Sequence, residues 1–344
     1  MGVCEICGKE SPLISSFLGV CGECVLKKES FRFVREAHRR ARERFGLPPE
    51  VPKGRGSKCF GCGNECVIPE NGKGYCGLVE NRNSKLIRLA GTPEKGLVSF
   101  YFDPLPTNCV ATPFCEGAKE RGYNLAVFYG ACNFDCLFCQ NWEFKGMTRE
   151  VKPLMSAEEL AEKANEETKC VCYFGGDPNP QLSHAIETSK ILAKRGVRVC
   201  METNGNANWR LLEKFAGIAF ETGGCVKFDL KAWNERLNIA LCGISNRVTL
   251  RNFEKLAGLR WDSPFLVAST LLVPGYVTPD EVEKISKFIA SLNPSIPYVL
   301  LAFYPTFLMD DLPTTSKELA EECLRRAKEN GLERVKIGNV HLLR

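Results

Sequence analysis

Three cysteines of this 344-residue chain stand close together, with the spacing Cys132-x3-Cys136-x2-Cys139. They follow an apolar run at residues 125–129, so a buried strand is expected to end where their loop begins. Three thiolates on one tight loop can bind three irons of a [4Fe–4S] cubane and leave the fourth iron open to a small molecule. A zinc site or three unrelated core cysteines are the alternatives. The spacing at a strand end, with Phe138 beside the third cysteine, favours the cluster.

The triplet is the signature of the radical S-adenosylmethionine (SAM) superfamily, which the chain resembles over roughly residues 124–305. Within it, the chain resembles the glycyl-radical-enzyme activases, typified by the pyruvate formate-lyase activating enzyme. Further motifs follow in the order of that family, each at the end of an apolar run: Gly175-Gly176-Asp177, Glu202-Thr203-Asn204-Gly205, Asp229-Leu230-Lys231, Leu272-Val273-Pro274-Gly275 and Leu301-Ala302-Phe303-Tyr304. Each motif alone would indicate only a turn, but all of them together, in this order, carry the resemblance.

The resemblance implies that a reduced cluster cleaves SAM and that the resulting 5′-deoxyadenosyl radical abstracts hydrogen from a substrate. It implies that the Gly-Gly-acid motif holds the amino group of the cofactor. It further implies that Glu202 and Asp229 form a monovalent-cation site beside the cofactor carboxylate, which Lys231 approaches. An electron donor of the flavodoxin or ferredoxin type is implied as a partner. No side chain is assigned a catalytic role. The expected cofactor-binding residues are Phe138, Gly175, Gly176, Asp177, Glu202, Asn204, Asp229, Lys231, Val273 and Tyr304.

Three positions depart from the activase pattern. Asp177 stands for Glu and Glu202 stands for Asp, so each keeps its charge while its reach changes by one methylene. We therefore expect cofactor binding to be retained. Tyr304 stands where the activases have His, which removes an imidazole from the adenine side of the site.

Two further cysteine groups precede the triplet. The spacing Cys4-x2-Cys7-x13-Cys21-x2-Cys24 is typical of a zinc ribbon, with a rubredoxin-like iron site as the alternative, and zinc is expected. The spacing Cys59-x2-Cys62-x3-Cys66-x9-Cys76 is less standard, and either zinc or an auxiliary [4Fe–4S] cluster fits it, with a slight preference for zinc.

The remaining cysteines are less informative. Cys109 and Cys115 could ligate a further cluster, face the active site or be ordinary buried residues. Asn141 and Trp142 could line the site or pack beneath it. Four cysteines lie within predicted strands and are expected to be core residues, and two carry no readable role: Cys170, Cys172, Cys200 and Cys225 in the first group, Cys242 and Cys323 in the second.

The elements that must position these groups are apolar runs alternating with amphipathic segments. Strands are predicted near residues 125–129, 170–174, 197–201, 225–230, 265–273 and 298–303, and a shorter one at 85–89. Helices are predicted over 157–166, 183–194, 248–257, 280–291 and 316–329, with Ser156, Thr278 and Thr315 as N-caps. Near-continuous apolar strands indicate a parallel sheet covered by helices, either a partial barrel or a doubly wound sheet. The resemblance favours an α/β partial (β/α)6 barrel of radical SAM type, preceded by N-terminal Cys-rich metal-binding modules.

Domain boundaries are predicted from composition. We expect a zinc-ribbon-like knuckle with a basic helix at 27–45 within residues 1–46, and a Pro- and Gly-rich linker at 47–57. A second Cys4 module with a lead-in follows at 58–123, and the barrel occupies 124–344. Residues 1–58 carry 12 Lys or Arg against 7 Glu, so the excess basic charge belongs to this appendage.

These features predict a radical SAM oxidoreductase with activase-like action on a protein or peptide. Modification of RNA such as tRNA, suggested by the basic helix, or of a small metabolite is the alternative. A non-catalytic electron-transfer or metal-storage protein is disfavoured by the open iron of the triplet. The sequence has no leader-like start and no apolar run long enough to span a membrane, so a cytoplasmic protein without a membrane partner is expected.

Overall fold

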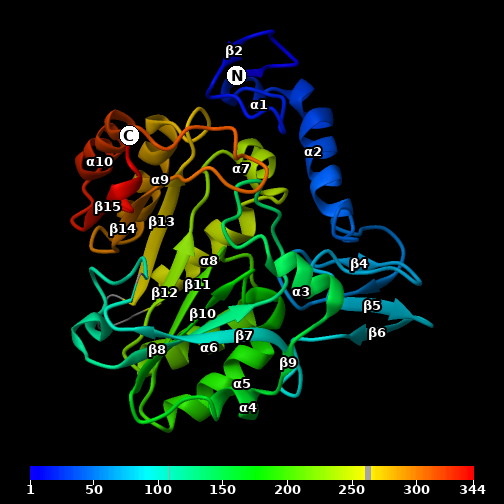
Figure 1. Cartoon of the computed structure of the whole chain (residues 1–344), viewed down its shortest axis with the longest axis vertical. Helices are drawn as coiled ribbons and strands as arrows, with labels where there is room; N and C mark the ends of the chain where they lie inside the picture. The colour runs from blue at the N-terminus through cyan, green and yellow to red at the C-terminus, as the bar shows by residue number, and fades with distance from the viewer. Residues whose placement is uncertain (108, 260–264) are drawn as a thin grey trace.

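The computed structural model describes residues 1–107, 109–259 and 265–344. Within these ranges the centre of the molecule is a nine-stranded sheet with the order β15-β14-β13-β12-β11-β10-β8-β7-β9 (Figure 1). Seven neighbouring strands are parallel: β8 (Tyr123–Tyr129), β10 (Thr168–Gly175), β11 (Arg198–Thr203), β12 (Val226–Asp229), β13 (Leu266–Leu272), β14 (Tyr298–Ala302) and β15 (Val335–Gly338). β7 (Gly96–Pro104) pairs antiparallel with β8, and β9 (Leu154–Met155) pairs antiparallel with β7.

The parallel strands follow one another across the sheet in their order along the chain. A doubly wound sheet would reverse this order at a switch point, so the arrangement is that of a barrel that does not close. Helices connect successive strands: α3 (Phe144–Glu150), α4 (Ala157–Ala161), α5 (Leu182–Ala193), α6 (Trp209–Glu221), α7 (Glu235–Cys242), α8 (Arg247–Ala257), α9 (Pro279–Leu292) and α10 (Lys317–Glu329). The expected partial barrel with an N-terminal Cys-rich part is confirmed.

The strands form where the sequence has apolar runs, because both faces of these strands are covered. All six predicted runs overlap a parallel strand, whereas β7 and β15 were not predicted.

Ser156 caps α4 in a capping box with Glu159, as expected from its type. The expectation that Thr315 caps α10 is wrong, because Ser316 occupies that position and accepts a bond from Leu319 N at 3.2 Å. The hydroxyl of Thr315 instead bridges β14 and β13 by contacts to Phe303 N and Leu272 O.

The N-terminal segment packs on the barrel. It contains β1 (Gly2–Val3), β2 (Glu10–Ser11), α1 (Gly22–Val25), the 3₁₀ turn η1 (Lys28–Ser30) and α2 (Phe31–Glu43), which descends along the molecule in Figure 1. Tyr276, just after β13, fixes the segment, since its hydroxyl donates to Val20 O at 2.9 Å and accepts from Ser15 N at 3.0 Å. α2 buries a face containing Val34, His38 and Arg42.

A second small module follows the linker. It consists of the hairpins β3 (Ser57–Lys58) with β4 (Val67–Ile68) and β5 (Val79–Arg82) with β6 (Lys85–Arg88). Cys62 forms a β-bridge with Ala207, in the segment that follows β11. Short 3₁₀ turns complete the structure: η2 (Glu116–Lys119), η3 (Asn179–Gln181) and η4 (Val340–Leu342). Among the helices in the described ranges, none has the length and apolarity that crossing a membrane requires.

Candidate active site at the carboxyl ends of the strands

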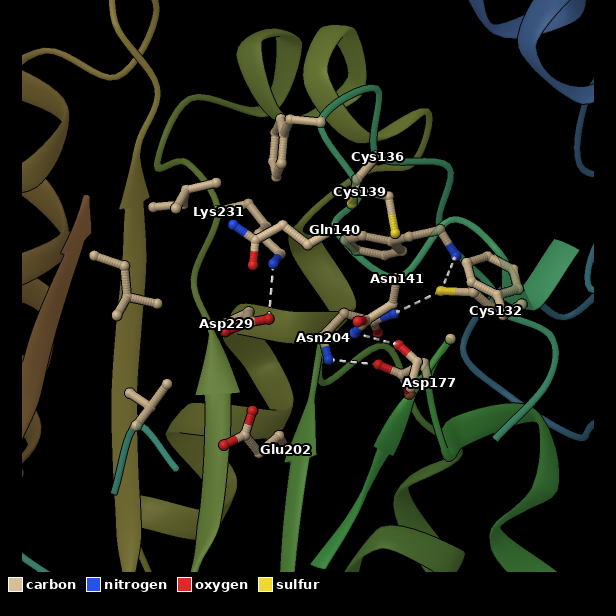
Figure 2. A pocket seen from close by; sticks show the side chains of 18 of the residues that line it. Cys132, Cys136, Cys139, Gln140, Asn141, Asp177, Glu202, Asn204, Asp229 and Lys231 are labelled. Atoms are coloured by element: carbon tan, nitrogen blue, oxygen red, sulfur yellow. Dashed lines mark hydrogen bonds and ion pairs between the residues drawn. The ribbon is translucent and has the colours of Figure 1, made fainter. Parts of the chain in front are cut away.

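The cysteine triplet forms one wall of a cavity of about 270 Å³ (Figure 2). Cys132, Cys136 and Cys139 lie in the loop that follows β8, where the parallel strands end. Their Sγ atoms are not all within 4.8 Å of one another, unlike those of the Cys4, Cys7, Cys21 and Cys24 group. Thiolates that each bind a different iron of a cubane are expected to be further apart than thiolates around a single ion. The donor set therefore fits a three-ligand [4Fe–4S] cluster better than a zinc ion.

Hydrogen-bond donors surround these sulfurs. The backbone N–H of Phe134 donates to Cys132 Sγ at 3.3 Å, and the side-chain amide of Asn204 donates to the same atom at 3.7 Å. A hydrogen bond from the Cys242 thiol, at the end of α7, lowers the pKa of Cys136. No role for Cys242 was predicted from sequence, because its position beside the triplet depends on α7 packing over the loop.

Asp135, inside the triplet, anchors the cluster loop. Its side chain is completely buried and contacts Lys145 Nζ at 2.5 Å, His38 Nδ1 at 2.9 Å and Arg42 Nη1 at 3.6 Å. Burial alone would raise the pKa of Asp135, but the Lys145 charge, the His38 hydrogen bond and the Arg42 charge together hold this pKa below its usual range. Two of the three partners lie on α2, so the N-terminal segment helps to position the cluster loop.

The wall opposite the triplet carries alternating charges. Asp229 accepts bonds from Lys231 Nζ and Lys227 Nζ, each at 2.7 Å, and Lys227 Nζ lies 3.2 Å from Glu202 (Figure 2 shows the Lys231 contact). Ser269 donates a further bond to Asp229 at 2.6 Å. Burial would raise the pKa of Asp229, but the two lysine charges hold it well below its usual range. The four charged groups balance to zero.

Lys227 also lines the cavity, although the motif comparison missed it. Its ammonium lies between Glu202 and Asp229, in the place that the resemblance assigns to a monovalent cation. Burial would lower its pKa, but the two carboxylates raise it above the usual value, so Lys227 is charged. Because side chains two residues apart in a strand share a face, Lys227 and Asp229 point the same way, and this periodicity could have identified the lysine.

Asp177 faces the cavity with its oxygen atoms already engaged. Its carboxylate accepts bonds from Asn204 N at 2.7 Å, Asn179 N at 2.8 Å and the Thr203 hydroxyl at 3.1 Å. Burial raises the pKa of Asp177 to about 7, although these hydrogen bonds act in the opposite direction. Asp177 thus links the end of β10 to the end of β11.

Most of the expected cofactor-binding residues come together, and two lie apart from them. The residues that line the cavity include Phe138, Gly175, Gly176, Asp177, Glu202, Asn204, Asp229 and Lys231, and also Asn141. Val273 is fully buried and Tyr304 is 53% exposed, and neither belongs to this lining. Trp142 stacks on Phe307, with ring centroids 5.6 Å apart, beside the cluster loop.

The first Cys4 group is compact. The Sγ atoms of Cys4, Cys7, Cys21 and Cys24 all lie within 4.8 Å of one another, and those of Cys7 and Cys21 are 3.9 Å apart. A tetrahedral zinc ion with Zn–S bonds of about 2.3 Å keeps its thiolates roughly 3.8 Å apart. The spacing of the sulfurs therefore suits one metal ion held by four thiolates.

The second Cys4 group is wider. Cys59, Cys62, Cys66 and Cys76 line one cavity together with Arg88, whose guanidinium lies 3.9 Å from Cys59 Sγ. Among the described residues, no three of these four thiols meet the 4.8 Å limit that the first group satisfies. The module also contacts the cluster loop, because the side chain of Asn64 donates to Asn133 O, next to Cys132, at 2.8 Å.

The chain is similar to proteins of one known superfamily. Residues 126–289 match the family profile of the Radical SAM superfamily. The chain is 27% identical over 302 residues to the uncharacterized protein MJ0808 of Methanocaldococcus jannaschii, covering 82% of this chain and 81% of that protein. It is 30% identical over 213 residues to the putative glycyl-radical enzyme activating enzyme MJ1632 of the same organism, covering 60% and 75%.

A more distant relative has a defined activity. The pyruvate formate-lyase 1-activating enzyme of Escherichia coli is 26% identical over 153 residues, which are 42% of this chain and 59% of that enzyme. The segment that matches the family profile, residues 126–289, contains the cluster loop and the charged strand ends described above. The chain belongs to the radical SAM superfamily and is an activase-like enzyme of the radical SAM class.

Proposed function

We propose that this protein modifies a protein or peptide substrate by activase-like hydrogen abstraction. The observation that carries the proposal is the cavity of about 270 Å³ in which the cysteine triplet faces Glu202, Lys227, Asp229 and Lys231. The similarity to the putative activating enzyme MJ1632 supports the choice of a protein substrate.

A [4Fe–4S] cluster would be held by Cys132, Cys136 and Cys139, and it would supply the electron for reductive cleavage of SAM. The other residues of the cavity bind and orient SAM before this cleavage. Lys231 and Lys227 offer positive charge to the carboxylate of the methionyl part, and Glu202 offers negative charge to its ammonium group. The backbone of Gly175 and Gly176 passes the same cavity without side chains that would fill it. Leu271 and Leu301 supply an apolar wall that limits water near the radical.

The two Cys4 groups are proposed to hold different metals. A structural zinc ion is supported at Cys4, Cys7, Cys21 and Cys24 by the compact tetrahedral spacing. At the Cys59–Cys76 group the wider spacing supports an auxiliary [4Fe–4S] cluster, which reverses the slight preference for zinc drawn from sequence. A flavodoxin- or ferredoxin-type protein is the proposed electron donor.

The basic helix α2 supports a protein substrate rather than RNA, because several of its charges are used inside the protein. Arg42 contacts Asp135 and donates to Pro48 O at 2.5 Å. Arg39 pairs with Glu36 and with Glu43, each at 2.5 Å. Arg42 is thereby used in positioning α2, whereas Arg39 is paired with carboxylates of its own helix. A phosphate backbone would have to compete with these carboxylates.

The test is transfer of deuterium into 5′-deoxyadenosine. The reconstituted, reduced enzyme is incubated anaerobically with SAM and a deuterium-labelled cell extract divided into protein, RNA and small-molecule fractions. The proposal predicts labelled 5′-deoxyadenosine with the protein fraction, and loss of the label when that fraction is first digested with protease. Label that comes from the RNA or the small-molecule fraction alone would contradict the proposed substrate class.

A further inference from the structure

Six cysteines line a second, smaller cavity inside the barrel. Two come from the connection between β7 and β8, two lie on β10, one lies on β11 and one directly precedes β12: Cys109, Cys115, Cys170, Cys172, Cys200 and Cys225. Two of these cysteines precede charged residues of the active site along the chain. Cys200 lies two residues before Glu202, and Cys225 lies two residues before Lys227 and four before Asp229. Because alternate residues share a face, these thiols and the charged residues point to the same side of the sheet. The thiol cavity therefore lies on the amino-terminal side of the SAM site.

Three of these thiols are close enough to share one ion. The Sγ atoms of Cys115, Cys200 and Cys225 all lie within 4.8 Å of one another, as do those of the N-terminal Cys4 group. The ligands proposed for iron–sulfur clusters in this chain do not meet that limit. The barrel thiols thus have the spacing expected around a single metal ion, since a zinc ion keeps its thiolates roughly 3.8 Å apart.

The surroundings favour a soft metal. The group contains sulfur donors and no carboxylate or imidazole, and Ala111 and Val267 pack around it. Sulfur donors select zinc or Cu(I) over magnesium, calcium or manganese. The cavity holds about 30 Å³, whereas the SAM cavity holds about 270 Å³. That space suits one ion with one water, which needs about 10–15 Å³.

We propose that Cys115, Cys200 and Cys225 bind one Zn²⁺ ion inside the barrel. The ion would tie the β7–β8 connection, through Cys115, to the strands β11 and β12. That connection also supplies Val110 to the lining of the SAM cavity and Cys109, whose thiol donates to Glu202 at 3.3 Å. The ion therefore fixes the floor of the SAM site.

Metal content per chain tests this site. Full-length protein is purified anaerobically from cells grown with added zinc, and zinc and iron are measured by mass spectrometry. Cys200→Ala/Cys225→Ala is expected to lose one zinc per chain relative to wild type and to keep its iron. Cys323→Ala, which removes a buried thiol on α10 outside all the metal groups, is expected to keep both metals. Equal zinc content in the double variant and wild type would overturn the proposal.

A second variant distinguishes loss of zinc through removal of a ligand from loss of zinc through misfolding. Cys115 lies in the β7–β8 connection and not in a strand, so Cys115→Ala leaves the sheet intact and is expected to lose the same one zinc with an unchanged circular dichroism spectrum. Peptide mapping of wild type under anaerobic conditions gives a further check, since a disulfide between any two of the three cysteines would overturn the proposal. Reductive cleavage of SAM is measured separately. Failure of the wild-type protein to cleave SAM would count against the proposed function and not against this zinc site.

Discussion

Lys227 sets the charge of the SAM pocket, and its replacement by methionine gives a quantitative test of that arrangement. The ammonium lies 2.7 Å from Asp229 and 3.2 Å from Glu202, and the side chain is 5% exposed. Lys227→Met keeps the length of the side chain and removes the charge. Lys231 then remains as the partner of Asp229, and the net charge of the four-residue group falls from zero to −1.

The expected loss follows from Coulomb's law. If the charge acts across roughly 6 Å in a medium with an effective dielectric constant of about 20, one unit of charge contributes about 3 kcal/mol to binding a carboxylate. This corresponds to a roughly 100-fold weaker binding of SAM by Lys227→Met, because about 1.4 kcal/mol is a factor of ten in affinity. Glu202 and Asp229 then face each other without the ammonium, so a monovalent cation can take its place.

The assay is the Kd for SAM, measured anaerobically by equilibrium dialysis in buffers with and without potassium. Wild type is expected to bind SAM equally well in both buffers, whereas Lys227→Met is expected to bind weakly without potassium and to recover with it. Lys227→Arg, which keeps the charge, and Lys214→Met, which removes an exposed lysine of α6, are the controls and should bind SAM normally. Potassium dependence in wild type, or undiminished binding by Lys227→Met without potassium, would refute the reasoning.

Three further outcomes follow from the same contacts. Asp135→Asn leaves Lys145 and Arg42 without their buried counter-charge and should lower the free energy of unfolding in urea by about 3–5 kcal/mol; a loss below about 1 kcal/mol would contradict this role. The pKa of about 7 at Asp177 means that the folded protein keeps a proton that the unfolded chain releases near pH 4, so stability in urea should fall as the pH rises from about 4 to 7, and Asp177→Asn should remove this slope. Cys7→Ala, which removes one thiolate from the Cys4–Cys24 group, should make residues 1–26 sensitive to limited proteolysis while the barrel stays resistant; unchanged cleavage would contradict a structural ion there.

The sequence was most informative where local pattern decides the structure. The spacing of Cys132, Cys136 and Cys139 and the apolar runs before each motif were sufficient to place the site at the carboxyl ends of parallel strands. That placement follows from chain direction, because parallel strands all end at the same edge of the sheet. The capping of α4 by Ser156 was equally local and was predicted.

What the sequence missed depends on contacts between distant segments. His38 and Arg42 lie almost one hundred residues before Asp135, and no spacing rule predicts that they meet it. Cys115 joins Cys200 and Cys225 only because the β7–β8 connection enters the barrel. Cys200 and Cys225 are buried in the core, as expected from sequence. Burial alone does not distinguish a core cysteine from a buried metal ligand.

The central claim, that the Cys132–Cys139 loop holds the cluster that cleaves SAM, is tested most directly by 5′-deoxyadenosine formation in the reduced, reconstituted protein. Wild type and Cys323→Ala are predicted to release 5′-deoxyadenosine and methionine in equal amounts. Cys132→Ala/Cys136→Ala/Cys139→Ala is predicted to release neither and to lose about four irons per chain, as expected for one [4Fe–4S] cluster. Cleavage of SAM by the triple variant at the wild-type rate would contradict the account.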